Sequence, residues 1–305
     1  MSDEPVQSAP ARVAFVFPGQ GSQSVGMDAG LDPATFAEAD DALGYALSAI
    51  VREGPVERLA QTEVTQPALL TTSIAMARML ARARPDIAPS FAAGHSLGEY
   101  GALVVAGVLD FGDAVRLVRL RGRAMQDAVP FGVGTMAAIM GLETEEVRAL
   151  CEAHAEGEVV ELAGHNCPGQ TVIAGHVGAV DRVCEAVGSG ARRLTVSAPF
   201  HCSLLRPAAD ALEAALADVR LHAPLFPVVQ NAYADVAPDV DGIRARLVEQ
   251  VVKPVRWMEC VQHMKGFGAA RCVEIGPGKT LAGLGKRIDR SLPVVSFADL
   301  LGGVA

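Results

Sequence analysis

The sequence lacks a long apolar run. With glycines allowed, its longest uninterrupted apolar stretch extends from Tyr100 to Leu109, well short of the ~18 residues that suggest a membrane-spanning helix. The first residues, MSDEPVQSAP, are acidic and contain no apolar core, so residues 1–11 are expected to form a mobile polar leader and not a signal peptide. These features predict a cytoplasmic protein with no membrane as a partner.

Closely spaced cysteines are also missing. No two cysteines form a C-x-x-C pair, and nothing indicates secretion, so neither a disulfide framework nor a structural zinc site is expected. We predict reduced thiols and no metal centre. The six cysteines are Cys151, Cys167, Cys184, Cys202, Cys260 and Cys272.

An excess of basic residues is absent as well. Lys and Arg total 26 against 35 Asp and Glu, which gives a formal net charge of −9, and no basic residues form a long block. Nucleic-acid-binding domains carry basic patches. Nucleic acid is therefore excluded as an expected partner.

What the sequence does contain is enough apolar material for a large interior. Hydrophobic residues make up 50% of its 305 residues and charged residues 20%. A chain of this length is at the size where a single core stops growing. We expect a globular protein with two domains, or one domain and a subdomain.

Strand-like and helix-like segments alternate in the first part of the chain. Apolar runs at Val13–Phe17 and Phe91–Gly94 favour buried strands, whereas amphipathic spacing favours helices at Ala34–Arg52, Pro67–Arg84 and Leu97–Ala106. Such alternation is typical of an α/β domain whose parallel sheet is covered on both faces.

A different order of elements follows between about Thr135 and Val196. The pattern is strand, helix, strand, strand, helix, strand, which is typical of a ferredoxin-like subdomain. We therefore expect an α/β core at 12–130 and 200–305, with the subdomain inserted at 131–199. The predicted subdomain segments are Thr135–Met140, Glu143–Ala155, Val159–Ala163, Gln170–Ala174, Val177–Val187 and Arg192–Val196, and the core resumes with Leu204–Val219, Pro227–Asn231, Ile243–Val252, Met258–Phe267 and Arg271–Ile275.

The clearest chemical motif is Gly94-His95-Ser96-Leu97-Gly98. This G-x-S-x-G sequence lies between a predicted strand and a predicted helix, the context of a nucleophile elbow. In such an elbow the serine occupies a sharp turn, and the following helix directs backbone N–H groups at the developing oxyanion. Ser96 is the predicted nucleophile.

A serine hydroxyl needs a general base within hydrogen-bond reach. His95 is adjacent in sequence, but consecutive side chains point apart, so we assign it to packing. His201 is the leading candidate because it lies where the subdomain returns to the core. Spacing alone leaves His154, His165, His176, His222 and His263 open, and no carboxylate stands out as a third triad member.

Two glycine-rich segments imitate nucleotide-binding motifs without matching them. Gly276–Thr280 ends like a P-loop, but the first glycine of that motif would fall at Val273. Gly19-Gln20-Gly21 follows a strand, yet Ser24 replaces the third glycine of a dinucleotide fingerprint. Neither a nucleotide nor a dinucleotide cofactor is expected.

Several segments together resemble the malonyl-CoA:acyl carrier protein transacylase family and the related acyltransferases of polyketide synthases. They occur in family order and extend the resemblance over about residues 12–297. The matching segments are Phe15–Gln23, Thr65–Leu70, Gly94–Tyr100, Arg121–Gln126, Asn166–Gln170 with Val172–Gly175, Ala198–His201, and Val273–Lys279.

The resemblance implies a ping-pong transfer of malonyl from malonyl-CoA to the phosphopantetheine thiol of an acyl carrier protein. Ser96 would carry the acyl group and His201 would be the base, oriented by a backbone carbonyl near Gln250. The backbone N–H groups of Gln20 and Leu97 would form the oxyanion hole. No bound cofactor is implied, since the coenzyme A thioester is a substrate.

The same resemblance assigns the substrate contacts. Arg121 matches the arginine that holds the malonyl carboxylate, although spacing alone places it in a helical row that is typical of a solvated face. Asn166 is assigned to substrate binding. Phe200 replaces a serine found in many fatty-acid-synthesis members and resembles the malonyl-selecting residue of polyketide acyltransferases. Fatty acid and polyketide synthesis both remain open.

Two other function classes remain as alternatives. A serine hydrolase or thioesterase could use the same elbow, and an inactive module could dock a carrier protein. A buried arginine argues for a carboxylate-bearing acyl group, because a general esterase gains nothing from an unpaired buried charge.

Since carrier proteins are generally acidic and this chain is also acidic, docking would need a local basic patch. We assign that patch to Lys279, Lys286 and Arg287.

Overall fold

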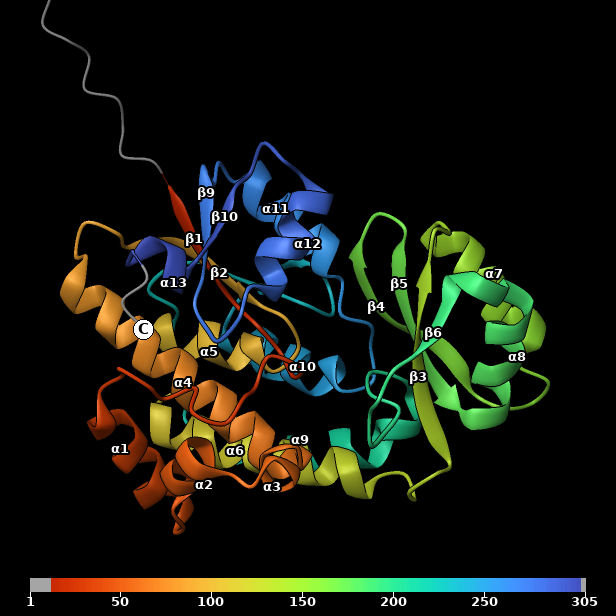
Figure 1. Cartoon of the computed structure of the whole chain (residues 1–305), viewed down its shortest axis with the longest axis horizontal. Coiled ribbons are helices and arrows are strands. Elements are labelled where there is room, and N and C mark those ends of the chain that lie inside the picture. The colour runs from red at the N-terminus through yellow and green to blue at the C-terminus, as the bar shows by residue number, and fades with distance from the viewer. Residues whose placement is uncertain (1–11, 303–305) are drawn as a thin grey trace, which may run out of the picture.

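Two separate β-sheets organise the chain (Figure 1). The computed structural model describes residues 12–302, so the leader expected at residues 1–11 lies outside the described residues. One sheet has six strands and is mostly parallel, and the other has four antiparallel strands. The expected α/β architecture with a second, smaller unit is therefore present.

The larger sheet has the strand order β10-β9-β1-β2-β7-β8. All neighbours run parallel except β7 and β8. Parallel strands place their carboxyl ends at one edge of the sheet, which is where ligands bind in open α/β folds. The strands are β1 (Val13–Phe17), β2 (Pro89–Gly94), β7 (Val228–Gln230), β8 (Asp235–Val236), β9 (Arg271–Glu274) and β10 (Val294–Ser296).

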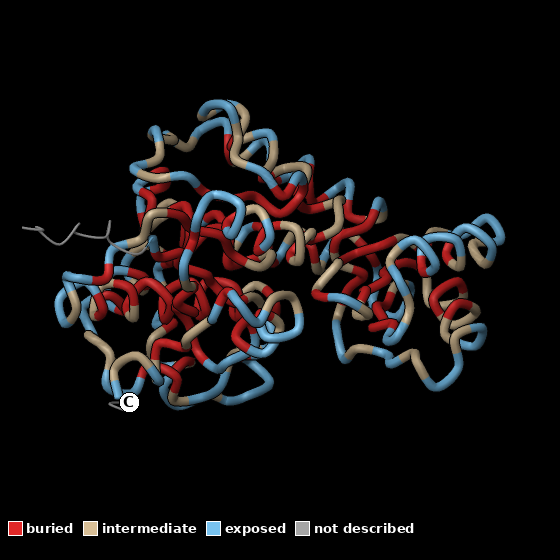
Figure 2. The backbone as a smooth tube through the Cα atoms, turned by 90° about the horizontal axis from the view of Figure 1, so that it is seen from above, coloured by how far each residue is buried: buried red, intermediate tan, exposed pale blue. Residues whose placement is uncertain are grey.

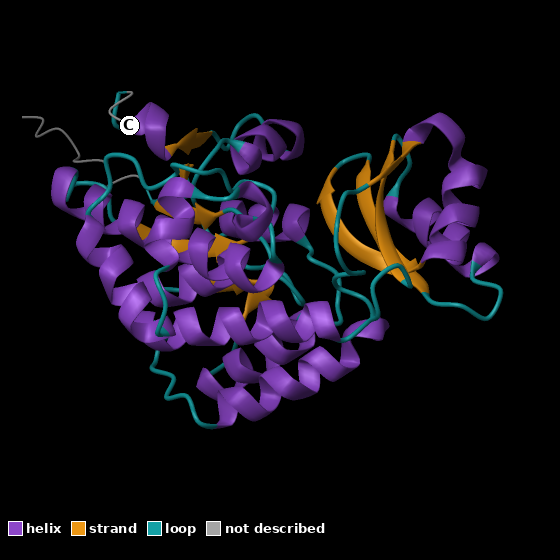
Figure 3. Ribbon diagram, turned by 60° about the horizontal axis from the view of Figure 1, so that its bottom comes forward, coloured by secondary structure: helices purple, strands orange, loops and turns teal. Residues whose placement is uncertain are grey.

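Helices cover both faces of this sheet (Figure 3). Strand β1 is buried throughout: Phe15 and Phe17 join one apolar cluster, and Ala14 and Val16 join the other. The α-helices of this unit are α1 (Pro33–Leu43), α2 (Leu47–Glu53), α3 (Val56–Leu59), α4 (Thr62–Ala83), α5 (Gly98–Val105), α6 (Phe111–Asp127), α9 (Arg206–Ala217), α10 (Val240–Gln250), α11 (Trp257–Gly266), α12 (Thr280–Ile288) and α13 (Phe297–Leu300).

The smaller unit has the chain order β3, α7, β4, β5, α8, β6 and the sheet order β4-β5-β3-β6. Its helices pack on one face of the sheet around Ile139, Val147 and Val180. The other face packs around Cys202, with Phe200 beside it, and so meets the chain that returns to the larger unit. The elements are β3 (Gly134–Met140), α7 (Thr144–His154), β4 (Val160–Cys167), β5 (Gln170–His176), α8 (Val177–Val187) and β6 (Ala191–Arg193).

A further contact joins the two units at the outer strand of the smaller sheet. Val255, between α10 and α11, pairs with Gly164 of β4 as a parallel bridge. The Val255 N–H donates to the Ala163 carbonyl at 3.0 Å, and the Val255 carbonyl accepts the His165 N–H at 2.8 Å. Figure 2 shows that buried chain fills the interior of both units.

Several boundaries differ from the sequence-based expectation. The single helix expected at Ala34–Arg52 is wrong: α1 ends at Leu43 because Gly44 adopts φ 72°, a left-handed conformation that commonly stops a helix. Helix α4 begins at Thr62 and contains Pro67 within it. The helix expected at Leu204–Val219 is a 3-10 turn at Ser203–Leu205 followed by α9. No helix within residues 12–302 is long and apolar enough to cross a membrane.

Candidate active site

Ser96 lies on the turn between β2 and α5. Its φ of 51° falls in the left-handed region, which costs a non-glycine residue ~1–3 kcal/mol. The flanking glycines permit this turn: a Cβ on Gly98 would lie 2.0 Å from the Phe17 carbonyl oxygen, and one on Gly94 would lie 1.9 Å from the Gly98 backbone. Together they bring α5 directly against β1, with Ser96 at the carboxyl edge of the sheet.

His201 meets Ser96 from the chain that leaves the smaller unit. Its Nε2 is 2.7 Å from Ser96 Oγ, and its Nδ1 is 2.8 Å from the backbone carbonyl oxygen of Gln250. Because a carbonyl oxygen can only accept, the proton lies on Nδ1. The unprotonated Nε2 is then free to accept the Ser96 hydroxyl proton.

Burial, assisted by the positive charge of Arg121, lowers the pKa of His201 to about 3. The imidazole is therefore neutral near pH 7, which is the state a general base requires. Among the described residues the ring nitrogens contact Ser96 Oγ and the Gln250 carbonyl, and no carboxylate.

Arg121 is 1% exposed, and its guanidinium points toward the Ser96 hydroxyl. Nη2 donates to Ser96 Oγ at 3.1 Å and to Gln250 Oε1 at 2.9 Å, and Nη1 donates to Gln66 Oε1 at 2.8 Å. Nε is buried and has no partner within the described chain. The side chains that contact the guanidinium directly are thus neutral, Glu99 acts on it only through its charge, and Arg121 does not lie on the solvated face that its spacing suggested.

The expected oxyanion-hole groups are in two loops, one after β1 and the other within the elbow. Gln20 follows β1 and Leu97 precedes α5. Within the hydrogen bonds formed by residues 12–302, neither backbone N–H donates to another protein group. The Gln20 side chain accepts a hydrogen bond from Gln66 Nε2 at 3.1 Å, which links this loop to the partner of Arg121.

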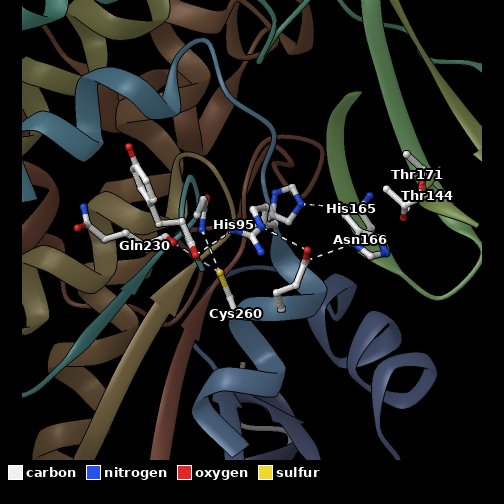
Figure 4. Close-up of polar contacts among 11 residues, drawn as sticks. His95, Thr144, His165, Asn166, Thr171, Gln230 and Cys260 are labelled. Carbon is white, nitrogen blue, oxygen red and sulfur yellow. Dashed lines mark hydrogen bonds and ion pairs between the residues drawn. The ribbon is translucent and has the colours of Figure 1, made fainter. Parts of the chain in front are cut away.

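Asn166 reaches the elbow from the smaller unit (Figure 4). Its Oδ1 is 2.9 Å from Nε2 of His95. Burial lowers the pKa of His95, so the neutral ring donates to this oxygen and leaves the Asn166 NH₂ group available. Phe200 is half-buried and packs against the apolar clusters of both units. Both residues line the boundary between the two units.

The residues expected to form a basic docking patch are at α12. Lys279 Nζ is 2.6 Å from Asp299 Oδ1. Arg287 donates to Gln170 Oε1 at 2.6 Å and to the Pro168 carbonyl at 3.4 Å, so it bridges to the smaller unit. Lys286 is exposed and forms no hydrogen bond or ion pair within the described residues.

Sequence reasoning missed three buried polar residues behind the dyad, namely Gln66, Glu99 and Asn231. Burial raises the pKa of Glu99, while hydrogen bonds from Asn231, Gln250 and Gln230 act in the opposite direction. Gln66 and Glu99 lie inside segments that resemble the family, and this resemblance was the only sequence signal that could have marked them as functional. Asn231 lies outside them, and no local pattern marks it.

The segment that imitates a P-loop is also accounted for. Glu274, at the end of β9, accepts the backbone N–H groups of Leu281 and Ala282 at 2.9 and 2.8 Å. These are the N–H groups that a bound phosphate would use at a helix N-terminus. Across residues 12–302, no cluster of three or more metal-ligating side chains is found.

Comparison with known proteins agrees with this geometry. Residues 14–302 match the family model described as an acyl transferase domain. The malonyl CoA-acyl carrier protein transacylase of Escherichia coli K12 is 51% identical over 285 residues, covering 90% of this chain and 92% of that protein.

Solved structures give the same result. The malonyl CoA-acyl carrier protein transacylase of Coxiella burnetii matches with a TM-score of 0.92 and 44% identity, covering 97% of this chain and 98% of that one. A malonyl-transacylase in complex with its holo type II PKS acyl-carrier protein matches with a TM-score of 0.92 and 46% identity, covering 96% and 99%. The chain therefore belongs to the malonyl-CoA:acyl carrier protein transacylase family of acyl transferases.

Proposed function

We propose that this enzyme transfers malonyl from malonyl-CoA to the phosphopantetheine thiol of an acyl carrier protein, through an acyl-enzyme at Ser96. The observation that carries the proposal is the buried guanidinium of Arg121, 3.1 Å from the Ser96 hydroxyl oxygen. A buried cation beside a nucleophile selects an acyl group with a carboxylate of its own.

The first half-reaction acylates Ser96. Its hydroxyl proton moves to His201 Nε2 as Oγ attacks the thioester carbonyl, and the backbone N–H groups of Gln20 and Leu97 hold the oxyanion. The carbon–sulfur bond then breaks, and the coenzyme A thiolate takes the proton back from Nε2. Throughout, the Gln250 carbonyl keeps Nδ1 protonated.

The second half-reaction reverses these roles. The thiol of the carrier protein gives its proton to His201 and attacks the malonyl-serine ester. Collapse of the tetrahedral intermediate returns the proton to Ser96 Oγ and leaves malonyl on the carrier. We propose that Asn166 and Phe200 border the path of the acyl group, because both lie at the boundary of the two units beside the elbow. No bound cofactor takes part in these steps.

The geometry favours transfer over the hydrolase alternative. A general esterase would face the desolvation cost of the Arg121 charge with no carboxylate to compensate it. The comparisons point the same way, since the relatives described above are named transacylases. The fatty acid and polyketide pathways both use a malonylated carrier protein, and both remain compatible with this site.

The finer architecture also belongs to this proposal. The element and strand orders support a ferredoxin-like subdomain at 131–199, and the elbow after a central parallel strand supports a hydrolase-like core at 12–130 and 200–305. For docking of the carrier protein we propose the α12 surface with Lys279, Lys286 and Arg287. Of these three, Lys279 and Arg287 form hydrogen bonds within the described chain, whereas Lys286 does not.

Intact mass measurement after incubation with malonyl-CoA alone tests the chemistry. We expect one malonyl group per chain in the wild type and none in Ser96→Ala. An adduct that persists in Ser96→Ala would place the nucleophile elsewhere. If the wild type instead releases malonate at the rate at which it consumes malonyl-CoA, the enzyme is a hydrolase.

A further inference from the structure

The parallel ladder between β2 and β7 stops one residue before it would reach the elbow. Ala92 and Ala93 pair with Val228 and Val229, and the Ala92 N–H donates to the Pro227 carbonyl at 3.0 Å. In a parallel ladder these bonds repeat every second residue. Continued, the register would give the Asn231 N–H to the Gly94 carbonyl, and the Ser96 N–H to the Asn231 carbonyl.

The side chain of Asn231 makes both of these bonds instead. Its Nδ2 donates to the Gly94 carbonyl at 2.7 Å, and its Oδ1 accepts the Ser96 N–H at 2.7 Å. A carboxamide has the same donor and acceptor as a peptide group. The ladder therefore extends through a side chain to the two backbone groups that flank His95.

The backbone of Asn231 is engaged elsewhere. Its N–H donates to Glu99 Oε2 at 2.8 Å, and its carbonyl accepts the Arg256 N–H at 3.2 Å. Glu99 also accepts Gln250 Nε2 at 2.9 Å and Gln230 Nε2 at 3.1 Å. All three partners of this buried carboxylate are donors, so they favour its ionised form and oppose the effect of burial, which raises its pKa. Through these bonds Glu99 fixes the turn that follows β7 to helix α5.

We propose that Asn231 is a positioning residue for the transacylase reaction. Its carboxamide replaces a peptide group and holds the nucleophile turn in its left-handed conformation, while Glu99 holds the Asn231 backbone. We call the two carboxamide hydrogen bonds, to the Gly94 carbonyl and from the Ser96 N–H, the clamp. This role rests on the proposed function. Asn231 is fully buried and contacts the reacting atoms only through the backbone of Ser96. Without the clamp, the Gly94 carbonyl and the Ser96 N–H lose their partners, and the turn can relax.

Relaxation of the turn moves Oγ away from His201 Nε2, now 2.7 Å distant. A displacement of about 1 Å can slow an oriented reaction ~10²-fold. Leucine has nearly the shape of asparagine but neither polar atom, so Asn231→Leu removes both bonds. We expect the rate constant for Ser96 malonylation to fall ~10²-fold in Asn231→Leu, with full labelling still reached at long times.

Asn231→Asp gives a test that a loss of packing cannot imitate. The ionised carboxylate of this variant still accepts the Ser96 N–H, but its second oxygen faces the Gly94 carbonyl, and two acceptors repel. Protonation supplies an O–H donor and restores the clamp. The ionisable neighbours are Glu99 from α5 and Cys260 from α11, whose Sγ is 4.0 Å from Asn231 Nδ2. Burial and negative charge on Glu99 both favour the protonated form of the introduced carboxyl group. The charge of Arg121, which lowers the pKa of Glu99 and reaches this region through Gln250, acts in the opposite direction.

We therefore expect Asn231→Asp to acylate slowly at pH 8 and to recover at least ~10-fold at pH 6, while the wild type and Asn231→Leu change little between these values. Circular dichroism at both pH values checks folding. Because the Asn231→Asp variant is compared with itself, the test stands even if Asn231→Leu does not fold. Malonylation by Asn231→Leu within ~3-fold of the wild type, or a wild-type pH profile in Asn231→Asp, would overturn the inference.

Failure of the proposed function would look different. In that case the wild type takes up no malonyl, and a fluorophosphonate probe, which requires an activated serine but no malonyl group, replaces malonyl-CoA in the same comparison. The expected order is unchanged: fast labelling of the wild type, slow labelling of Asn231→Leu, and acid recovery in Asn231→Asp. Equal labelling of all three at both pH values would exclude the clamp.

Discussion

Arg121 is a buried cation that no carboxylate contacts directly within the described chain. Removing a buried charge pair costs ~2–5 kcal/mol, so Arg121→Ala should lower kcat/KM for malonyl-CoA at least ~30-fold. Acetyl-CoA leaves the guanidinium unpaired in the wild type, and that penalty disappears in the variant. We expect the acetyl-to-malonyl ratio of acylation rates to rise.

Arg123→Ala is the matched control for this prediction. Arg123 is on the same helix but is exposed and pairs with Asp127, so both substrates should be unaffected. If Arg121→Ala slowed malonyl and acetyl transfer by the same factor, Arg121 would have only a structural role and the malonyl assignment would lose its main physical support.

The depressed pKa of His201 predicts a loss of stability in acid. The folded value of about 3 lies below the ordinary value of ~6.5, so the unfolded chain binds the proton more tightly. The contribution of His201 to the free energy of unfolding is fully present above pH 6.5 and is lost as the pH decreases from 6.5 toward 3. At pH 5.5 this residue should cost ~1.4 kcal/mol in the free energy of unfolding.

Denaturant unfolding of the wild type and of His201→Gln at pH 7.5 and 5.5 measures this effect. The wild type should lose ~1.4 kcal/mol more than the variant over this interval. Equal losses would mean that the folded histidine titrates normally, and the argument from burial would be wrong.

At the scale of elements, the contact between α5 and β1 leaves no space for a side chain at Gly98. A Cβ there would lie 2.0 Å from the Phe17 carbonyl oxygen, and backbone cannot yield as a flexible side chain can. We expect Gly98→Ala to destabilise the protein by at least ~3 kcal/mol. Gly283, in α12, has nothing within 4 Å of its Cβ position, so Gly283→Ala should stabilise by ~0.5–1 kcal/mol.

Thermal or denaturant unfolding of the two variants tests this contrast. A Gly98→Ala protein as stable as the wild type would show that the helix can shift off the strand, and the close approach would then not be needed to place Ser96.

Elements with strong periodicity could be predicted from the sequence. Strand β1 and helix α8 have the expected bounds, because their apolar spacing is set by burial alone. Helix α12, strand β10 and the two-residue strand β8 were missed. They are short, and the two strands are defined by pairing with another strand, β10 with β9 and β8 with β7. The break at Gly44 was overlooked because apolar spacing continues across it.

The candidate site divides in the same way. Ser96 is marked by a local motif, and its meeting with His201, 105 residues away, follows from the resemblance. Asn231 could not be predicted, because its role depends on the register of β2 and β7 and on a backbone that departs from it. A single asparagine after a strand carries no local sign of that register.

At the scale of the whole molecule, the net charge of −9 opposes association with an acidic carrier protein. Lys286→Glu should therefore raise KM for the carrier protein several-fold at low salt, and the effect should shrink as salt screens it. Self-acylation by malonyl-CoA should not change. Arg116→Glu, an exposed change on α6 far from α12 in Figure 1, is the control for net charge.

Steady-state transfer rates at 20 and 300 mM salt, roughly three- to fourfold different in Debye length, measure this dependence. Equal KM values for the wild type and Lys286→Glu at low salt would move the docking surface away from α12.

The carbonyl oxygen that faces His201 Nδ1 has a consequence for the lifetime of the acyl-enzyme. A neutral partner stabilises an imidazolium less than a carboxylate does, so His201 is a weak base. A thiol with a pKa near ~8.5 needs little assistance to become a nucleophile, whereas water, with a pKa of ~15.7, needs a great deal. Malonyl-serine should therefore persist in water and yet react promptly with a thiol. A backbone carbonyl in the place of a carboxylate at His201 Nδ1 would thus favour transfer of the acyl group to a thiol over its hydrolysis.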